Sequence, residues 1–128
     1  MKTTIVIAVG ISPTMQDRLR AAQDRDEGFS LLEAEDEFEA IALLSHTTPD
    51  VLMINLGLAS GSPLAVADYA AYKHPDARVI YEMGEGMRGF ADGSVFALSA
   101  NAHGCVTPSM RPEDMAAVVA HHATARVA

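Results

Sequence analysis

The chain has 128 residues, of which 49% are hydrophobic and 20% are charged, and it carries a formal net charge of −8 at pH 7. This composition predicts a single globular domain, and an acidic chain without a run of Lys or Arg is a poor fit for a nucleic-acid backbone. No apolar run reaches the roughly 18 residues that a membrane span requires, and a single cysteine, Cys105, excludes an internal disulfide, so we expect a cytoplasmic protein.

The predicted elements alternate between strands and helices along the chain. Each strand is a short run rich in β-branched or other apolar residues, and capping residues or prolines mark several helix starts. In chain order they are a strand at Thr4–Val9, a helix from Ser12 to Gly28, a strand at Phe29–Ala34, a helix at Glu37–Leu44, a strand at Val51–Leu56, a helix from Pro63 to Tyr72, a strand at Arg78–Met83, a short helix at Ser94–Asn101, a strand at His103–Thr107 and a helix from Arg111 to Thr124.

This alternation predicts the fold class. Five strands interleaved with five helices indicate a parallel sheet covered on both faces, that is, a doubly wound, flavodoxin-like α/β domain spanning residues 1–128. The helical periodicity also predicts which faces meet the sheet. These inward residues are Met15, Leu19 and Ala22 in the first helix, and Phe38, Ile41 and Ala42 in the second.

Residues 84–89 read GEGMRG and match the G-x-G-x-x-G pattern of dinucleotide-binding loops. That fingerprint belongs to the first strand–helix turn of the fold, whereas this copy follows the fourth strand and is separated from the next helix by Phe90–Gly93. We therefore interpret residues 84–93 as a flexible connection. The alternative is a flavodoxin-like small-ligand binder or enzyme that uses this loop.

The order and spacing of several segments resemble the receiver domain of bacterial two-component response regulators. The resemblance covers essentially the whole chain and is carried by KTTIVIAVG, EAEDEFEAIALL, PDVLMINL, PDARVIYEM and NAHGCVTPSMRPEDM. It implies chemistry in which an aspartate accepts a phosphoryl group beside a Mg²⁺ held by acidic side chains, while a hydroxyl and a lysine bind the product.

The residues that carry this chemistry are replaced in the present sequence. The resemblance places them, in order, at Val9 and Gly10 for the acid pair, Asn55 for the acceptor, Met83 for the hydroxyl, Pro108 for the lysine and Cys105 for the aromatic switch residue. An amide is a poor nucleophile, and Val and Gly offer no ligand to Mg²⁺. The sequence thus predicts a pseudo-receiver that binds no Mg²⁺ or cofactor and is not an enzyme.

The last helix offers a candidate interaction surface. Its inward face is predicted to carry Met115, Val118, Val119 and His122, which leaves an outward face poor in charge. The resemblance implies contacts through the fourth helix, fifth strand and fifth helix. The candidate residues are Phe90, Phe96, Arg111, Glu113, Ala116, Ala117, Ala120 and Thr124. Because alanine is also simply a good helix former, this surface and an ordinary solvated face remain alternatives.

The sequence therefore predicts a non-catalytic, phosphorylation-independent signalling or regulatory protein of bacterial type. It is expected to act through a protein partner or as a homodimer, with neither nucleic acid nor membrane as its target. An alternative is a receiver-like module of a larger assembly, such as the machinery of pilus biogenesis or secretion.

Overall fold

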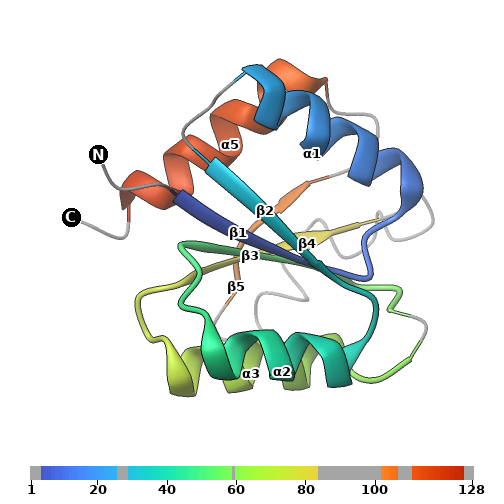
Figure 1. The fold of residues 1–128 in the computed structure, drawn as a ribbon, viewed down its shortest axis with the longest axis vertical. Helices are drawn as coiled ribbons and strands as arrows, with labels where there is room; N and C mark the ends of the chain where they lie inside the picture. Colours follow the sequence, from blue (N-terminus) through green and yellow to red (C-terminus); the bar gives the residue numbers. More distant parts are fainter. Residues whose placement is uncertain (1–3, 26–28, 59, 84–101, 107–110, 126–128) are drawn as a thin grey trace.

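The computed structural model describes residues 4–25, 29–58, 60–83, 102–106 and 111–125. Five parallel strands form one sheet in the order β2-β1-β3-β4-β5 (Figure 1). The strands are β1 (Thr4–Val9), β2 (Phe29–Ala34), β3 (Val51–Asn55), β4 (Arg78–Glu82) and β5 (Ala102–Val106). The described helices are α1 (Pro13–Arg25), α2 (Glu37–His46), α3 (Pro63–Lys73) and α5 (Pro112–Ala125).

The helices cover the sheet on both faces. Helices α1 and α5 lie side by side over one face, and α2 and α3 pair over the other (Figure 1). Each layer has its own core because the side chains of a strand alternate between the two faces. Val6, Met53 and Ile80 point toward α1 and α5, whereas Ile7 and Ile54 point toward α2 and α3. This confirms the predicted doubly wound, flavodoxin-like α/β architecture.

Local signals in the sequence set the helix starts. Asp36 caps α2 by accepting a hydrogen bond from the amide of Glu39 at 2.8 Å. Ser62 caps α3 in the same way through the amide of Ala65 at 3.2 Å, and Pro63 occupies the first turn. These caps place the starts of α2 and α3 beside the carboxyl ends of the strands, where ligand sites of this fold form.

Most predicted boundaries are confirmed, with small shifts at strand ends. Strands β3 and β4 end at Asn55 and Glu82, one residue earlier than predicted, and β5 begins at Ala102. Met15, Leu19 and Ala22 are fully buried, as predicted for α1. The predicted helix at Ser94–Asn101 and the GEGMRG motif lie outside the described residues.

The predicted inward face of α2 is wrong. Ala40 and Leu44 are fully buried against the sheet, whereas Phe38 is 83% exposed and Ala42 is also exposed. Helix α2 carries apolar residues at helical spacing on two sides, so periodicity alone offers two possible phases. In the structure, the side with the small residue Ala40 approaches the sheet, which directs Phe38 outward.

Candidate functional site

The ends of β1, β3 and β4 meet at the carboxyl edge of the sheet, where a receiver would hold its phosphoryl group. Val9, at the end of β1, is fully buried on the α2–α3 side of the sheet. Gly10 follows with a positive φ of 57°, and its amide donates to the carbonyl of Ala34 at 2.7 Å. Asn55 ends β3 and pairs in register with Glu82 of β4. Three of the predicted positions, Val9, Gly10 and Asn55, are therefore brought together.

The side chain of Asn55 uses both ends of its amide in hydrogen bonds to the backbone. Its Nδ2 donates to the carbonyl oxygen of Gly10 at 3.0 Å, and its Oδ1 accepts from the amide of Gly57 at 2.8 Å. The first bond requires a donor, which an ionised aspartate at this position would lack. Asn55 thus ties the loop after β1 to the loop after β3.

Leu58 fills the space beside Gly10. A Cβ atom built on Gly10 would collide with Cδ1 of Leu58 and would lie 3.2 Å from the carbonyl oxygen of Glu35. The positive φ of Gly10 is also a conformation that residues with a side chain rarely adopt. A side chain at position 10 would therefore be strained in this backbone conformation and would require Leu58 to move.

A buried carboxylate, Glu82, lies near these residues and was missed by the sequence reasoning. Its Oε1 accepts from the amide of Ser12 at 2.9 Å, its Oε2 accepts from the hydroxyl of Ser12 at 2.6 Å, and the residue is only 2% exposed. The Ser12 hydroxyl in turn accepts from the amide of Met15 at 3.2 Å and caps α1. An acidic residue near the end of the buried strand RVIYE was the signal that could have revealed it.

The other predicted pocket positions are only partly described. Met83, predicted for the hydroxyl position, is buried, and its amide donates to the carbonyl of Val106 at 2.9 Å. The backbone of Cys105 belongs to β5, but its side chain and Pro108 lie outside the described residues. Within the described ranges, no group of three or more His, Cys, Asp or Glu side chains is arranged to hold a metal ion.

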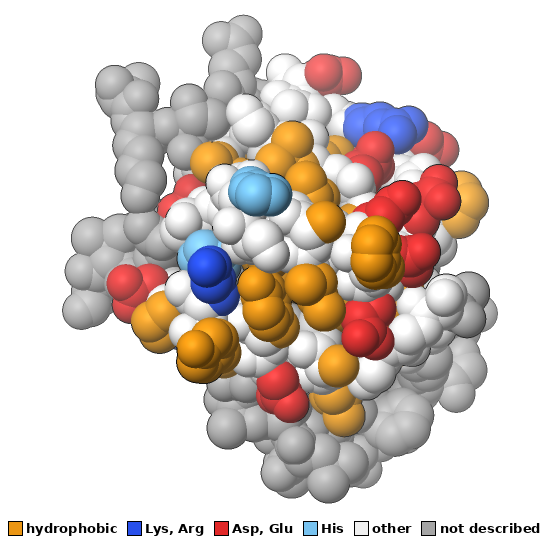
Figure 2. Space-filling model, turned by 60° about the horizontal axis from the view of Figure 1, so that its bottom comes forward, with side chains coloured by type: hydrophobic (Ala, Val, Ile, Leu, Met, Phe, Trp, Pro, Cys, Tyr) orange, Lys and Arg blue, Asp and Glu red, His pale blue; other side chains and the backbone are white. Residues whose placement is uncertain are grey.

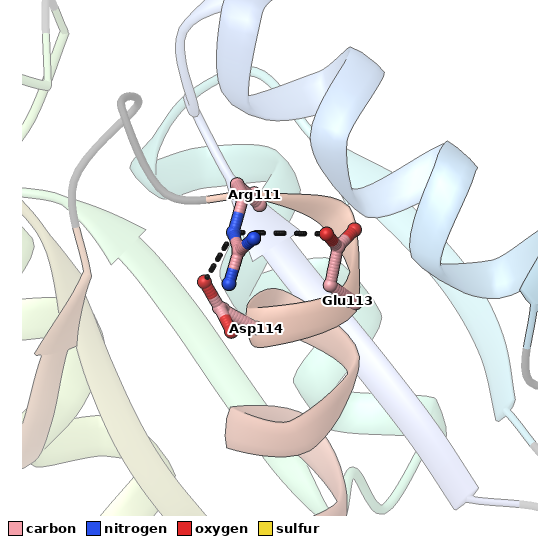
Figure 3. Close-up of polar contacts among 3 residues, drawn as sticks. All are labelled: Arg111, Glu113 and Asp114. Carbon is pink, nitrogen blue, oxygen red and sulfur yellow. Dashed lines mark hydrogen bonds and ion pairs between the residues drawn. The ribbon is translucent and has the colours of Figure 1, made fainter.

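The outward face of α5 is partly described. Glu113, Ala117 and Ala120 are exposed and Ala116 is half-buried, while Met115 and Val119 are buried as predicted. At the start of the helix, Arg111 pairs with Asp114 at 3.1 Å and with Glu113 at 3.6 Å (Figure 3). The hydrogen bond that Arg111 donates to the carboxylate of Asp114 raises the pKa of Arg111 above its usual value. Phe90, Phe96 and the side chain of Thr124 lie outside the described residues.

His103 occupies an irregularity where β4 pairs with β5. Val79 is in register with Ala102 and Ile80 with Gly104, so His103 has no partner in the register of the ladder. Its ring Nδ1 instead lies 2.8 Å from the amide nitrogen of Val79 and accepts its hydrogen bond. Burial, together with the nearby charge of Arg78, holds the pKa of His103 below its ordinary value. The neutral ring is the form that can accept this bond.

Comparisons with known proteins place the fold. No protein-family model matches the sequence, and no curated protein is detectably similar to it. None of the described helices is long and apolar enough to cross a membrane. Solved structures, in contrast, resemble the chain along nearly its whole length, as the following three show.

The CheY-like response regulator receiver domain protein from Methanospirillum hungatei JF-1 matches with a TM-score of 0.79 at 16% identity, over 99% of this chain and 98% of that one. The REC domain of AraT, a response regulator from Geobacillus stearothermophilus, matches with a TM-score of 0.76 at 20% identity, over 98% and 95%. NtrX from Brucella abortus matches with a TM-score of 0.81 at 18% identity, over 98% of this chain but only 28% of that one. The chain thus has the fold of response-regulator receiver domains.

Proposed function

We propose that this chain is a pseudo-receiver, a non-catalytic signalling or regulatory domain that works without aspartyl phosphorylation and acts by contact with another protein. Its receiver fold favours a role in signalling. The observation that carries the rest of the proposal is the hydrogen bond from the Asn55 amide to the carbonyl of Gly10. An ionised carboxylate in place of Asn55 could not donate this hydrogen bond.

The surroundings of Asn55 support the same interpretation. A receiver needs acidic oxygens that face a divalent cation, because Mg²⁺ prefers hard anionic ligands in near-octahedral geometry. Here Leu58 occupies the space beside Gly10, and both carboxylate oxygens of Glu82 accept hydrogen bonds from Ser12. At the carboxyl edge of the sheet, these side chains therefore pack against the loops and hydrogen-bond to them.

Two arrangements of such a domain are compatible with a protein-contact function. One is a domain that acts alone, and the other is a module of a larger assembly. NtrX from Brucella abortus, in which the matched fold accounts for 28% of the chain, shows that this fold also occurs within longer proteins. The outward face of α5 around Ala117 and Ala120 remains our prediction for one contact surface.

The experiment that tests the function is affinity capture from cells of the natural host. The purified chain is used as bait after incubation with Mg²⁺ and acetyl phosphate, and in parallel without the phosphoryl donor. A catalytically competent receiver domain in the same buffer checks that the donor is active. We expect the same partner in equal amount from both baits. Capture that depends on the donor would contradict the proposal.

A further inference from the structure

Helix α2 has apolar residues on the side that faces away from the sheet. Its inward residues Ala40 and Leu44 are fully buried, so the sheet is already covered. Phe38 is nevertheless 83% exposed, and it lines a surface hollow together with Ile41 and Ala42. A solvated helix normally presents polar residues on its outer side, as α1 does with Asp17, Arg20 and Asp24. The outer face of α2 is thus unusual for a surface in contact with water alone.

Helix α3 extends this apolar surface. Tyr72 is 85% exposed and Leu64 is 37% exposed, and together with Phe38 they are the large hydrophobic residues that are exposed in the described part of the chain. The hydroxyls of Ser45 on α2 and Tyr69 on α3 form a hydrogen bond of 3.1 Å that links the two helices. Figure 2 shows hydrophobic side chains gathered over these helices. We define the α2–α3 surface as Phe38, Ile41, Ala42, Leu64 and Tyr72.

Two shallow hollows flank Phe38. One, of about 380 Å³, runs between the start of α2 and the loop at Ser60 and Gly61. The other, of about 400 Å³, is lined by Ala42, Leu43 and His46. Phe38 lines both hollows. Hollows of this kind suit a helix with apolar side chains on one face. Such a helix inserts its residues at i, i+3 or i+4 and i+7 into a groove on its partner.

The charge around this surface indicates the chemistry of its partner. Helices α2 and α3 carry Glu37, Glu39 and Asp68 against a single Lys73, and Asp36 caps α2 beside Phe38. Acidic side chains border the hydrophobic patch in Figure 2. Complementary charge at the rim speeds association and fixes orientation, so a partner with Lys or Arg beside its apolar residues fits this rim. A second copy fits less well, because two acidic rims of a chain with net charge −8 would meet.

We propose that the α2–α3 surface docks an amphipathic helical segment of another protein, with apolar residues on one face and Lys or Arg at its edges. This inference rests on the proposed function and deepens it by naming the chemistry of the partner. The α2–α3 surface is separate from the α5 face. The inference is supported by the exposure of Phe38 and Tyr72, the two hollows that Phe38 lines and the acidic rim.

The test places a photo-crosslinking amino acid, p-benzoylphenylalanine, at position 38 of the full chain in cells of the natural host. The matched control carries it at position 14, which is exposed on α1, on the other face of the sheet. Crosslinked segments are identified by mass spectrometry. In parallel, the variants Phe38→Glu and Thr14→Glu are compared as affinity baits after thermal melts have shown that both remain folded. Because Phe38 is exposed, we expect its substitution to leave the melting temperature nearly unchanged.

We expect position 38 to crosslink to another protein, within a segment that has apolar residues at helical spacing and flanking Lys or Arg. Phe38→Glu should lower recovery of that protein at least tenfold, while Thr14→Glu should leave it unchanged. A crosslink from position 38 to a second copy, to an acidic segment, or to nothing would overturn the inference. A partner captured equally well by wild type and Phe38→Glu would also overturn it, while leaving the proposed function standing.

Discussion

The side-chain amide of Asn55 donates a hydrogen bond to the carbonyl oxygen of Gly10 at 3.0 Å and so joins the loops that follow β3 and β1. The substitution Asn55→Asp keeps the shape of the residue but removes this donor and points a negative charge at the carbonyl. We expect it to lower the free energy of unfolding by about 1–3 kcal/mol, measured by urea denaturation at pH 7.5.

Acidification provides the control for this prediction. A protonated carboxyl group regains a donor, so the deficit of the Asn55→Asp variant relative to wild type should shrink as the pH falls. An equally stable variant at pH 7.5 would show that the bond from Asn55 to Gly10 contributes nothing to the fold.

The pair Glu82 and Ser12 is expected to stabilise the start of α1. Replacing the buried Glu82 with leucine leaves the amide and hydroxyl of the half-buried Ser12 without their acceptors. We expect the free energy of unfolding to fall by about 2–4 kcal/mol, because hydrogen bonds to a charged group are strong and unsatisfied buried donors are costly. Ser12→Ala should cost about 1–2 kcal/mol through the lost cap and hydroxyl contact.

A double-mutant cycle separates this interaction from general damage to the core. The free energy of unfolding that the double variant loses should be smaller than the sum of the losses in the two single variants, because both substitutions remove the same contact. Strictly additive losses would mean that Glu82 and Ser12 do not interact energetically.

His103 should make stability depend on pH in a defined direction. Its pKa is lowered in the folded state by burial and by Arg78, so the unfolded chain binds a proton more readily. The contribution is fully present above the ordinary histidine pKa of about 6.5 and is lost as the pH falls through the lower folded value. We therefore expect the free energy of unfolding to decrease on going from pH 8 to pH 5.

Other groups titrate in the same range, so the comparison requires a variant. His103→Asn retains an acceptor close to the position of Nδ1 and does not titrate. The fall in stability between pH 8 and pH 5 should be smaller in this variant than in the wild type. If both chains show the same pH dependence of stability, the titration of His103 is not the cause of the fall between pH 8 and pH 5.

The outward face of α5 is tested with Ala117→Glu and Ala120→Arg. Both positions are exposed, so stability should change by less than about 0.5 kcal/mol. If this face contacts a partner, the same variants should weaken association, because a charge without a partner inside an interface can cost several kcal/mol. A thermal melt paired with sedimentation or pull-down separates the outcomes. A melt that drops by many degrees would place the alanines in the core, and no change in either measurement would identify an ordinary solvated surface.

The fold could be predicted because its signals are local and repeated. The runs Thr4–Val9 and Phe29–Ala34 are too short for ordinary helices and rich enough in apolar residues for buried strands, and the structure has the same bounds for both. Strand ends were less predictable. Leu56 and Met83 continue the apolar runs of β3 and β4, but the strands end one residue before each of them.

Two features of the candidate site depend on tertiary contacts that no pattern reveals. The orientation of α2 was misjudged because Phe38 and Ala40 belong to competing apolar stripes, and packing against the sheet decides between them. The role of Glu82 depends on Ser12, 70 residues away in the sequence. Asn55 could be identified as a departure from the receiver pattern, whereas its bond to Gly10 became visible only in the folded chain.

Intact-protein mass spectrometry after incubation with Mg²⁺ and acetyl phosphate tests the central claim most directly. The wild-type chain should keep its mass, because the acceptor position holds the hydrogen-bonded amide of Asn55 and Leu58 fills the space beside Gly10. The Asn55→Asp variant should also stay unmodified, since the single change supplies no acid pair for the metal. A Mg²⁺-dependent gain of one phosphoryl mass on either chain would contradict the account.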